Sequence, residues 1–437
     1  MSLERTPDAD PSPAEVSSAT KGRRRSLWRQ ADFMKLWTGQ TISQFGDEIT
    51  GLALPLLAIR ILGADAWQMG LLGVVRFLPW ILFTLPAGVW VDRMRRRPIL
   101  IGADVARAAL LATIPVAFVG GWLTMAQVFV VAFIAGTLEV FFDVAYQSYL
   151  PSIVERDELV EGNSKLELSR AGSSVAGPTV AGFLVELVRA PFAIAFDALS
   201  YLAAALAVFT IRRPEAAAPP HDPASGRRPS MWQDARAGLG YVAASPYLRS
   251  IAACTGTLNL FGNIGGVLLL LYASDELNLS PGMLGIIFAL GNVGVLVAAL
   301  TAGRLAKRIG LGWVIVGTAM LDGVALVFIP LAPRDNPFWF LVIGGLIAGF
   351  ATVVYNVNQV ALRQAITPDR MLGRMNATMR LIVWGTVPIG ALLGGILGST
   401  IGLQAALWVS AIGSFLGFLP VFFSPVRQLR EIPAQAE

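Results

Sequence analysis

Two short segments decide the fold: GVWVDRMRRRP at residues 88–98 and GRLAKRIG at residues 303–310, which begin 215 residues apart. Each begins with a Gly and brings basic side chains to the end of an apolar stretch long enough to cross a bilayer. Basic residues directly after an apolar span are typical of loops between transmembrane helices. The two segments therefore predict a membrane protein with two related halves.

Three further markers recur at nearly the same spacing. The triplet FGD at residues 45–47 returns as FGN at 261–263, an offset of 216 residues. The predicted turns before Asn163 and Asn376 also correspond once one residue is inserted in one of them. A Gly lies 14 positions and another 19 positions after each of these two Asn residues. Repeats at a fixed period indicate structural units with the same chain path. We predict six spans repeated in one orientation, as in transporters whose halves rock about a site at mid-membrane.

The composition excludes a soluble protein. Apolar residues make up 55% of the 437 residues and charged residues only 14%, whereas soluble chains have about a quarter of their residues charged. One Cys (Cys254) and one His (His221) allow no internal disulfide and no metal site of the usual Cys and His kind. None of the Lys residues follows a Gly, so a GK[ST] phosphate-binding loop is absent from the sequence. We expect no metal and no cofactor.

Twelve apolar stretches are long enough to cross a bilayer as helices, which takes about 20 residues each. They lie near residues 34–61, 68–91, 99–119, 123–147, 166–188, 191–211, 248–273, 282–306, 311–332, 337–362, 377–400 and 403–424. Because they use most of the chain, no room remains for a separate soluble catalytic domain. We predict an all-α integral membrane protein with 12 transmembrane helices as two six-helix repeats.

The polar segments set the predicted boundaries and orientation. The expected parts are a disordered cytoplasmic tail at 1–30, six-helix bundles at 31–212 and 248–425, a cytoplasmic linker at 213–247 and a tail at 426–437. The linker holds His221, expected to be a solvated residue, and ends in a short interfacial helix that begins with a capping box at Ser230 and Gln233. Basic residues gather on the side of the termini, which places both termini in the cytoplasm and the chain in the inner membrane.

The motifs resemble those of the major facilitator superfamily over residues 30–425. The segment at 88–98 is similar to the signature loop between spans 2 and 3, and GPTVAG at 177–182 is similar to the Gly-Pro motif of the drug:proton antiporters. Asp104 with Arg107, and Leu150 followed by Pro151, resemble the branch of macrolide-efflux and enterobactin-exporter proteins. The resemblance implies alternating access and export.

By the same resemblance, the signature loop acts as a latch that stabilises one of two conformations. The alternative is that its charges only fix topology. Asp104 and Arg107 are three apart on one helical face, and we expect them to form ion pairs with the latch rather than to contact substrate. The predicted latch residues are Gly88, Asp92, Arg93, Arg96, Asp104, Arg107, Gly303, Lys307 and Arg308.

Asp47 is the residue that we expect to couple proton movement to transport. It lies about 13 residues into the first span, near mid-depth at roughly 1.5 Å per residue, where an unpaired carboxylate is costly. Its counterpart in the repeat is Asn263, so this place accepts a polar group in both halves. The alternative is a structural hydrogen bond beside Gly46. Glu48 is a weaker candidate because its counterpart is Ile264.

Three other intramembrane charges are candidates for coupling or substrate contact. Arg76 lies at a similar depth in the second span and can pair with Asp47 or Glu48, either as a working switch or as a static ion pair. Glu139 and Asp143 are four apart and share a face, from which either can relay protons or attract a cationic substrate.

Small residues and Pro predict hinges or close helix packing, because Gly removes side-chain bulk and Pro removes a backbone donor. These residues are Gly177, Pro178, Gly182, Pro388, Gly390 and Gly394. We interpret Asp197 and Asp322 as members of packing networks. Polar side chains within the spans that are placed to orient a ligand are Gln44, Gln147, Asn356, Asn358 and Gln359.

The sequence as a whole favours a secondary transporter that exports amphipathic small molecules, such as macrolide-like drugs or siderophores, by proton antiport. Uptake by solute:proton symport and a non-transporting receptor on the same fold remain alternatives. A membrane-embedded enzyme is disfavoured, since the only His lies in the linker and the only Cys stands alone in a span. The expected partners are a small molecule, protons and the lipid bilayer; we expect a monomer and no nucleic acid.

Overall fold

The computed structural model describes residues 27–91, 93–155, 158–213, 215 and 231–431. This part of the chain is helical and contains no strand. Asp92, residues 1–26 and 432–437 of the predicted tails, and residues 214 and 216–230 of the predicted linker, with His221 and Ser230, lie outside the described residues.

Six long helices form the first half: α2 (Ala31–Arg60), α3 (Ala66–Val91), α4 (Arg96–Val119), α5 (Met125–Ile153), α6 (Leu159–Val188) and α7 (Ala190–Phe209). The second half contains α9 (Pro246–Asp275), α10 (Pro281–Ile309), α11 (Leu311–Val327), α12 (Phe338–Ile366), α13 (Asp369–Ile401), α14 (Leu403–Leu416) and α15 (Leu419–Phe422). Helix α8 (Met231–Ala244) precedes α9, and short 3-10 turns lie at η1 (Leu27–Arg29) and η3 (Pro425–Gln428).

The predicted all-α membrane fold is confirmed, and the twelve predicted spans correspond to α2–α7, α9–α13 and α14 with α15. Ten of these helical segments are long and apolar enough to cross a membrane by length and composition. The exceptions are α2, whose apolar run is interrupted by Asp47 and Glu48, and α11, which has only 17 residues. Helix α11 is shorter than expected because the chain leaves the helix at Phe328 and enters a turn.

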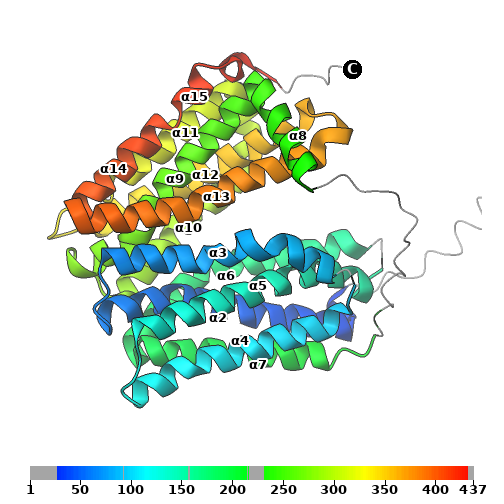
Figure 1. Ribbon diagram of the computed structural model, residues 1–437, viewed down its shortest axis with the longest axis vertical. Coiled ribbons are helices and arrows are strands. Elements are labelled where there is room, and N and C mark those ends of the chain that lie inside the picture. The colour runs from blue at the N-terminus through cyan, green and yellow to red at the C-terminus, as the bar shows by residue number, and fades with distance from the viewer. Residues whose placement is uncertain (1–26, 92, 156–157, 214, 216–230, 432–437) are drawn as a thin grey trace, which may run out of the picture.

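The helices lie in two groups, α2–α7 and α9–α15, as Figure 1 shows. We call the end of the molecule at which α2 begins and α7 ends the linker end, and the opposite end the far end. At the linker end the Arg97 guanidinium donates to the backbone oxygen of Phe209 at 2.6 Å, and Lys35 Nζ donates to that of Thr210 at 2.7 Å. The first and last helices of the first half are thereby joined at this end.

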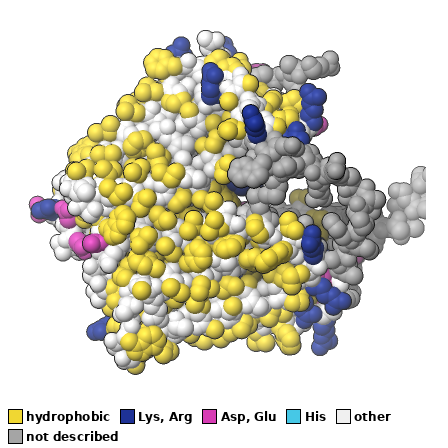
Figure 2. Space-filling model, in the orientation of Figure 1, with side chains coloured by type: hydrophobic (Ala, Val, Ile, Leu, Met, Phe, Trp, Pro, Cys, Tyr) yellow, Lys and Arg dark blue, Asp and Glu magenta, His cyan; other side chains and the backbone are white. Residues whose placement is uncertain are grey.

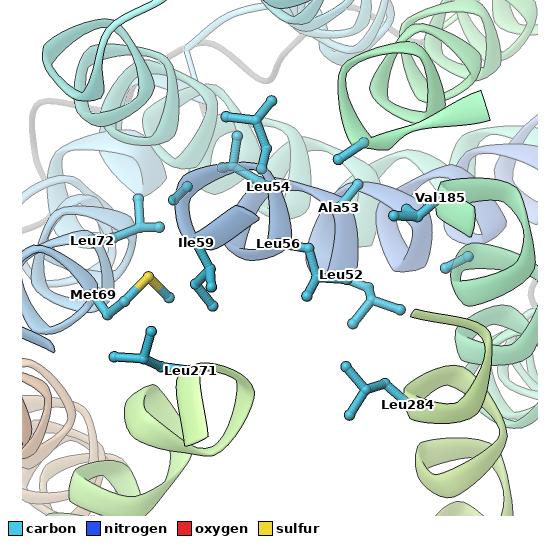
Figure 3. Close-up of a cluster of buried hydrophobic side chains, with 14 of the residues drawn as sticks. Leu52, Ala53, Leu54, Leu56, Ile59, Met69, Leu72, Val185, Leu271 and Leu284 are labelled. Carbon is cyan, nitrogen blue, oxygen red and sulfur yellow. The ribbon is translucent and has the colours of Figure 1, made fainter. Parts of the chain in front are cut away.

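A buried apolar cluster joins the two halves toward the far end (Figure 3). Leu52, Leu56 and Ile59 of α2 contribute to the same cluster as Leu271 of α9 and Leu284 of α10. Burying such side chains gives about 1.5–3 kcal/mol each in water, but in lipid close van der Waals packing between helices replaces that term. The far end is therefore held by shape complementarity.

Two charged side chains add hydrogen bonds between the halves at the far end. Arg60, at the end of α2, donates to Ser274 Oγ at 2.9 Å and to the backbone oxygen of Leu279 at 2.5 Å. Glu186, near the end of α6, accepts from the backbone N–H of Gly282 at 2.8 Å, at the start of α10. Hydrogen bonds to ionised groups contribute about 1.5–3 kcal/mol each, so these contacts stabilise a state that is closed at the far end.

Hydrophobic side chains cover most of the face in view in Figure 2, and Lys and Arg side chains lie mainly at its upper and right margins. Many large apolar side chains on the long helices are exposed, among them Leu187, Leu199 and Leu300. Soluble monomers rarely expose apolar patches above a few hundred Å². This surface is suited to lipid.

Candidate functional site

A cavity of about 630 Å³ lies between the two halves. The first half contributes Glu48, Arg76 and Pro178, while α9–α12 contribute a wall that is largely Leu, Ile, Val, Phe, Ala and Gly. A mainly apolar wall with a few charged groups is the usual composition of a small-molecule site. The cavity is suited to an amphipathic molecule whose polar part meets Glu48 and Arg76.

Glu48 lies against the Gly-Pro motif of α6. A β-carbon at Gly177 would come within 2.6 Å of Glu48 Cγ, and Pro178 lines the same cavity as Glu48. Only a Gly at position 177 leaves room for the Glu48 side chain at this helix crossing. The sequence predicted Gly177 as a hinge or close-packing residue; the structure places it against Glu48, a charged residue of the cavity wall.

Arg76 reaches toward α2 but forms no ion pair within 4 Å among the described residues. Its guanidinium lies 3.9 Å from where a β-carbon of Gly51 would stand, about one turn from Glu48. The side chain is exposed to the cavity that it lines. Its charge acts on Asp47, Glu48 and Glu139 without direct contact.

Asp47 is the first member of a chain of polar contacts that runs into the first half. Tyr201 of α7 donates its hydroxyl to Asp47 Oδ1. The guanidinium of Arg107 lies over the Tyr201 ring at 4.3 Å and over the Phe142 ring at 4.5 Å, and it donates to Asp104 Oδ1 at 2.7 Å. We call Asp47, Tyr201, Arg107 and Asp104 the relay.

The two ends of the relay differ in exposure. Asp104 and Arg107 are 0% and 4% exposed, whereas Asp47 is exposed although its carboxylate also feels the charges of Arg107 and Arg76. A carboxylate that water can reach at one end of a buried charged chain can exchange a proton there while the other end stays fixed. The structure therefore separates an exposed residue, Asp47, from a buried ion pair.

Arg107 pairs with Asp104 of its own helix in this state, and its predicted pairing with the signature loop stays a prediction, since Asp92 lies outside the described residues. Its described partners are Asp104, Phe142 and Tyr201, and none of them belongs to the loop between α3 and α4. Sequence reasoning missed Tyr201, which follows Asp197 by four residues in an otherwise apolar helix. In the sequence, the one feature that points to Tyr201 is this spacing, one helical turn after the carboxylate of Asp197.

Asp197 fixes the crossing of α2 and α7 next to the relay. It accepts hydrogen bonds from Thr50 and from Ser200 Oγ, the latter at 3.0 Å. A β-carbon at Gly46 would overlap Ser200 Oγ and Asp197 Oδ1. Gly46 thus lets α2 approach α7 closely enough for Tyr201 to reach Asp47.

Glu139 and Asp143 lie on one helix but have different neighbours. Glu139 is exposed and feels the charges of Asp47, Arg76 and Arg107. Asp143 accepts from Gln147 at 2.8 Å and feels the charges of Arg170 and Arg380. Glu139 therefore interacts electrostatically with Asp47, whereas Asp143 interacts with Arg380 of α13.

The signature loop is tied to the start of the central segment. Glu215 accepts from the backbone N–H groups of Arg96 at 2.7 Å and of Arg97 at 3.1 Å, at the start of α4. A carboxylate at a helix N-terminus is stabilised by the helix dipole and by the unpaired N–H groups. Gly88 lies in the last turn of α3 and Arg93 lies in the turn between α3 and α4, whose Asp92 is outside the described residues. Sequence reasoning did not single out Glu215.

The second copy of the loop differs from the first. Lys307 and Arg308 are exposed in the last turn of α10, and no ion pair of the described residues includes them. A β-carbon at Gly303 would meet open space. At the start of α11 the backbone N–H groups of Leu311 and Gly312 donate instead to the backbone oxygens of Arg430 at 3.1 Å and Leu429 at 2.8 Å, in the place where Glu215 accepts at the start of α4.

The Gly residues of the second Gly-rich helix, α13, pack against α9. A β-carbon at Gly390 would overlap the backbone oxygen of Leu260, and one at Gly394 would lie 2.7 Å from Val267 Cγ2. Pro388 lies within α13 just before them. In the first half, Gly182 faces Gly285 of α10, with 3.0 Å between a Gly182 β-carbon and Gly285 Cα.

Comparison with known proteins identifies the family. A family model described as transmembrane secretion effector matches residues 26–436. The chain belongs to this family of major facilitator superfamily transporters. The predicted superfamily and a transporter rather than an enzyme are thereby confirmed.

Curated relatives of this transporter are exporters by name. It is 24% identical over 404 residues to macrolide efflux protein A of Streptococcus pyogenes, covering 92% of this chain and 97% of the relative. It is 26% identical to the multidrug efflux pump Tap of Mycolicibacterium fortuitum, covering 88% and 93%. It is 25% identical to the enterobactin exporter EntS of Escherichia coli, covering 92% and 94%.

Solved structures agree on the fold of the transporter. A bacterial homologue of the iron transporter ferroportin in its inward-facing state superimposes with a TM-score of 0.72 at 17% identity, over 91% of this chain and 99% of that one. The nucleoside transporter NupG gives a TM-score of 0.68 at 14% identity, over 90% and 99%. At this identity the likeness shows the fold alone, and the chain is a multi-pass membrane protein of that fold.

Proposed function

We propose that this transporter exports amphipathic small molecules across the inner membrane in exchange for protons, with both termini in the cytoplasm. The observation that carries the proposal is the interface cavity, whose apolar wall carries Glu48 and Arg76, with the exposed residue Asp47 directly before Glu48 on α2. The exporters among its relatives support the direction. Opening the cavity alternately at the two ends would move its contents across the membrane.

Asp47 is the proposed proton carrier of this exchange. In the state closed at the far end its carboxylate accepts from Tyr201 and is balanced by Arg107 and Arg76. When substrate binds near Glu48 and Arg76, the charge balance around Asp47 changes, and a proton can leave or enter through the cavity. The relay would hold Asp47 in place while this occurs.

The latch and the hinge residues have proposed roles in the conformational change. Glu215 on the α4 N-terminus would hold the signature loop in the present state. Gly182, which faces Gly285, would let α6 and α10 slide past each other between the halves, and Gly394 would let α13 slide against α9 within the second half, without side-chain collision. The working unit is proposed to be a monomer, because the cavity lies wholly within one chain.

Proteoliposomes loaded with a pH-sensitive dye test the proposal. A panel of macrolides, cationic dyes and siderophores is applied to the wild type, to Asp47→Asn and to the control Glu167→Gln, whose side chain is 71% exposed on α6. Substrate-dependent proton movement is expected in the wild type and the control and should vanish in Asp47→Asn. Transport without proton movement would exclude antiport.

The same vesicles decide the direction. Under antiport, an imposed proton gradient drives substrate against the protons, whereas symport for uptake drives both the same way. Substrate moving with the protons would replace export by uptake. Absence of transport of every compound, with intact binding, would favour a receptor on the same fold.

A further inference from the structure

The helices of the second half enclose a second cavity, of about 680 Å³. Its lining comes from α9, α11, α12 and α13, and it shares Leu326, Ala348 and Thr352 with the interface cavity. The two cavities therefore adjoin. The second is more polar, and its amide side chains are Asn259, Asn263, Asn356, Gln359, Gln364 and Asn376.

Arg363 of α12 lines this cavity with a positive charge that no carboxylate balances. The side chain is 8% exposed, and no described residue forms an ion pair with it. Its Nε is buried without a hydrogen-bond partner. Burying an unpaired charge is strongly unfavourable, so a guanidinium held in this way at a cavity wall is ready to receive an anion.

Gln359 provides a second unsatisfied group on the same face. It is four residues before Arg363 and 2% exposed, and its Oε1 has no hydrogen-bond partner. Its Nε2 donates to Asn356 Oδ1 at 2.9 Å, which fixes the amide orientation. The pair thus offers a cation and, beside it, an acceptor for a ligand hydroxyl or N–H.

The other two charged residues of the cavity, Asp322 and Arg380, have different surroundings from Arg363. Asp322 accepts from Thr352 Oγ1 at 3.0 Å and from Ser414 Oγ at 3.2 Å. Thr352 precedes Arg363 by 11 positions on α12, about 16 Å along the helix, so Asp322 is too distant to pair with Arg363. Arg380 lies 5.5 Å from the Trp384 ring and acts on Asp143 of the first half.

We propose that Arg363 binds a carboxylate of the transported molecule and that the substrates are amphipathic organic anions. This inference rests on the proposed transport function and adds the substrate class. The planar guanidinium binds a carboxylate through two parallel hydrogen bonds, Gln359 accepts from a neighbouring donor of the ligand, and the apolar body extends into the adjoining interface cavity. Asp322 and Glu48 then disfavour a substrate with several negative charges.

Equilibrium binding tests the proposal without any proton gradient. The purified full chain in phosphatidylcholine nanodiscs is titrated with three compounds of matched apolar body: 1-naphthaleneacetate, 2-(1-naphthyl)ethanol and 2-(1-naphthyl)ethylamine. Empty nanodiscs correct for partitioning into lipid. The wild type is expected to bind the carboxylate at least about ten-fold more tightly than the alcohol, which corresponds to about 1.4 kcal/mol.

Two variants locate the preference. Arg363→Gln should abolish it while leaving the affinity for the alcohol unchanged. Gln359→Glu should also abolish it, because the new carboxylate pairs with Arg363 at i, i+4 and occupies the site while the guanidinium stays in place. Arg304→Gln is the matched control, since Arg304 is an exposed Arg near the same end of the second half whose Nη1 bonds only to its own helix.

Several results would overturn the assignment. These are equal affinity for all three compounds, no binding of the carboxylate, tighter binding of the amine, or an unchanged preference in Gln359→Glu. Loss of carboxylate binding when phosphatidylglycerol replaces phosphatidylcholine would assign Arg363 to a lipid headgroup instead. Because binding is read without transport, failure of antiport at Asp47 and failure of the anion site are separate outcomes.

Discussion

Gly70 of α3 and Gly395 of α13 meet across the two halves with backbone against backbone: a β-carbon at Gly70 would lie 2.6 Å from Gly395 Cα. The same substituent would lie 2.7 Å from the backbone oxygen of Ala391. Neither neighbour is the flexible end of a side chain, so nothing can move aside except a helix. This contact therefore closes the far end only while both positions are Gly.

Gly70→Val is expected to shift the transporter away from the state closed at the far end. Overpacking costs about 1–3 kcal/mol, enough to change a two-state ratio by about five- to 150-fold. Pulsed electron paramagnetic resonance between spin labels at positions 65 and 399, in a background with Cys254 replaced by Ser, should show a longer distance. Gly266→Val, on α9 where a β-carbon meets open space, is the control and should leave the distance unchanged.

Arg60→Ala should open the far end by a different route. It removes hydrogen bonds to Ser274 and to the Leu279 carbonyl, and hydrogen bonds to a charged group contribute about 1.5–3 kcal/mol. The same label pair reports the change. Arg334→Ala removes another far-end Arg, which pairs with Glu276 at 3.0 Å but is 74% exposed, so it should have little effect. Equal shifts in the two variants would mean that Arg60 acts only through surface charge.

The repeat offers a matched pair of Gly variants for stability. Gly46 lies against Asp197 and Ser200, whereas its counterpart Gly262 faces open space. Gly46→Ala should lower the melting temperature of the detergent-purified protein by several degrees, because α2 and α7 must separate. Gly262→Ala should leave the melting temperature unchanged or raise it slightly, since Ala favours a helix by up to about 1 kcal/mol over Gly. Similar destabilisation in both would show that the clash at Gly46 is relieved elsewhere.

The membrane fold was predictable because it depends on quantities that a sequence contains. Apolar run length, basic loop residues and the offset between residues 45–47 and 261–263 predicted helices and their repeat. The ends of the helices were described less well: α13 begins at Asp369 rather than near residue 377, α6 begins at Leu159 rather than near residue 166, and α11 ends at Val327 rather than near residue 332.

The candidate site was only partly predictable because it depends on how each helix is rotated about its axis. Asp47 was selected from its depth, yet the partner that it contacts is Tyr201, 154 positions away. In the sequence Arg363 looks like the basic residues of the loops, and only the structure places it at a cavity wall where no carboxylate of the described residues pairs with it. The position of a charged residue in the sequence indicates its depth in the membrane and the side on which it lies. Which residues balance its charge depends on how the neighbouring helices pack around it.

A substitution at Tyr201 tests whether Asp47 needs the rest of the relay to carry a proton. Tyr201→Phe removes the hydroxyl that donates to Asp47 but keeps the ring beneath the Arg107 guanidinium. Losing a hydrogen bond to a charged group costs about 1.5–3 kcal/mol, so substrate-dependent proton movement in the dye-loaded vesicles should fall by about ten-fold or more. Substrate binding at equilibrium should change little, because Tyr201 does not line either cavity. Tyr149→Phe is the matched control: Tyr149 is 1% exposed and its hydroxyl has no hydrogen-bond partner among the described residues. Undiminished proton movement in Tyr201→Phe, with Asp47→Asn still inactive, would show that Asp47 carries the proton without the relay.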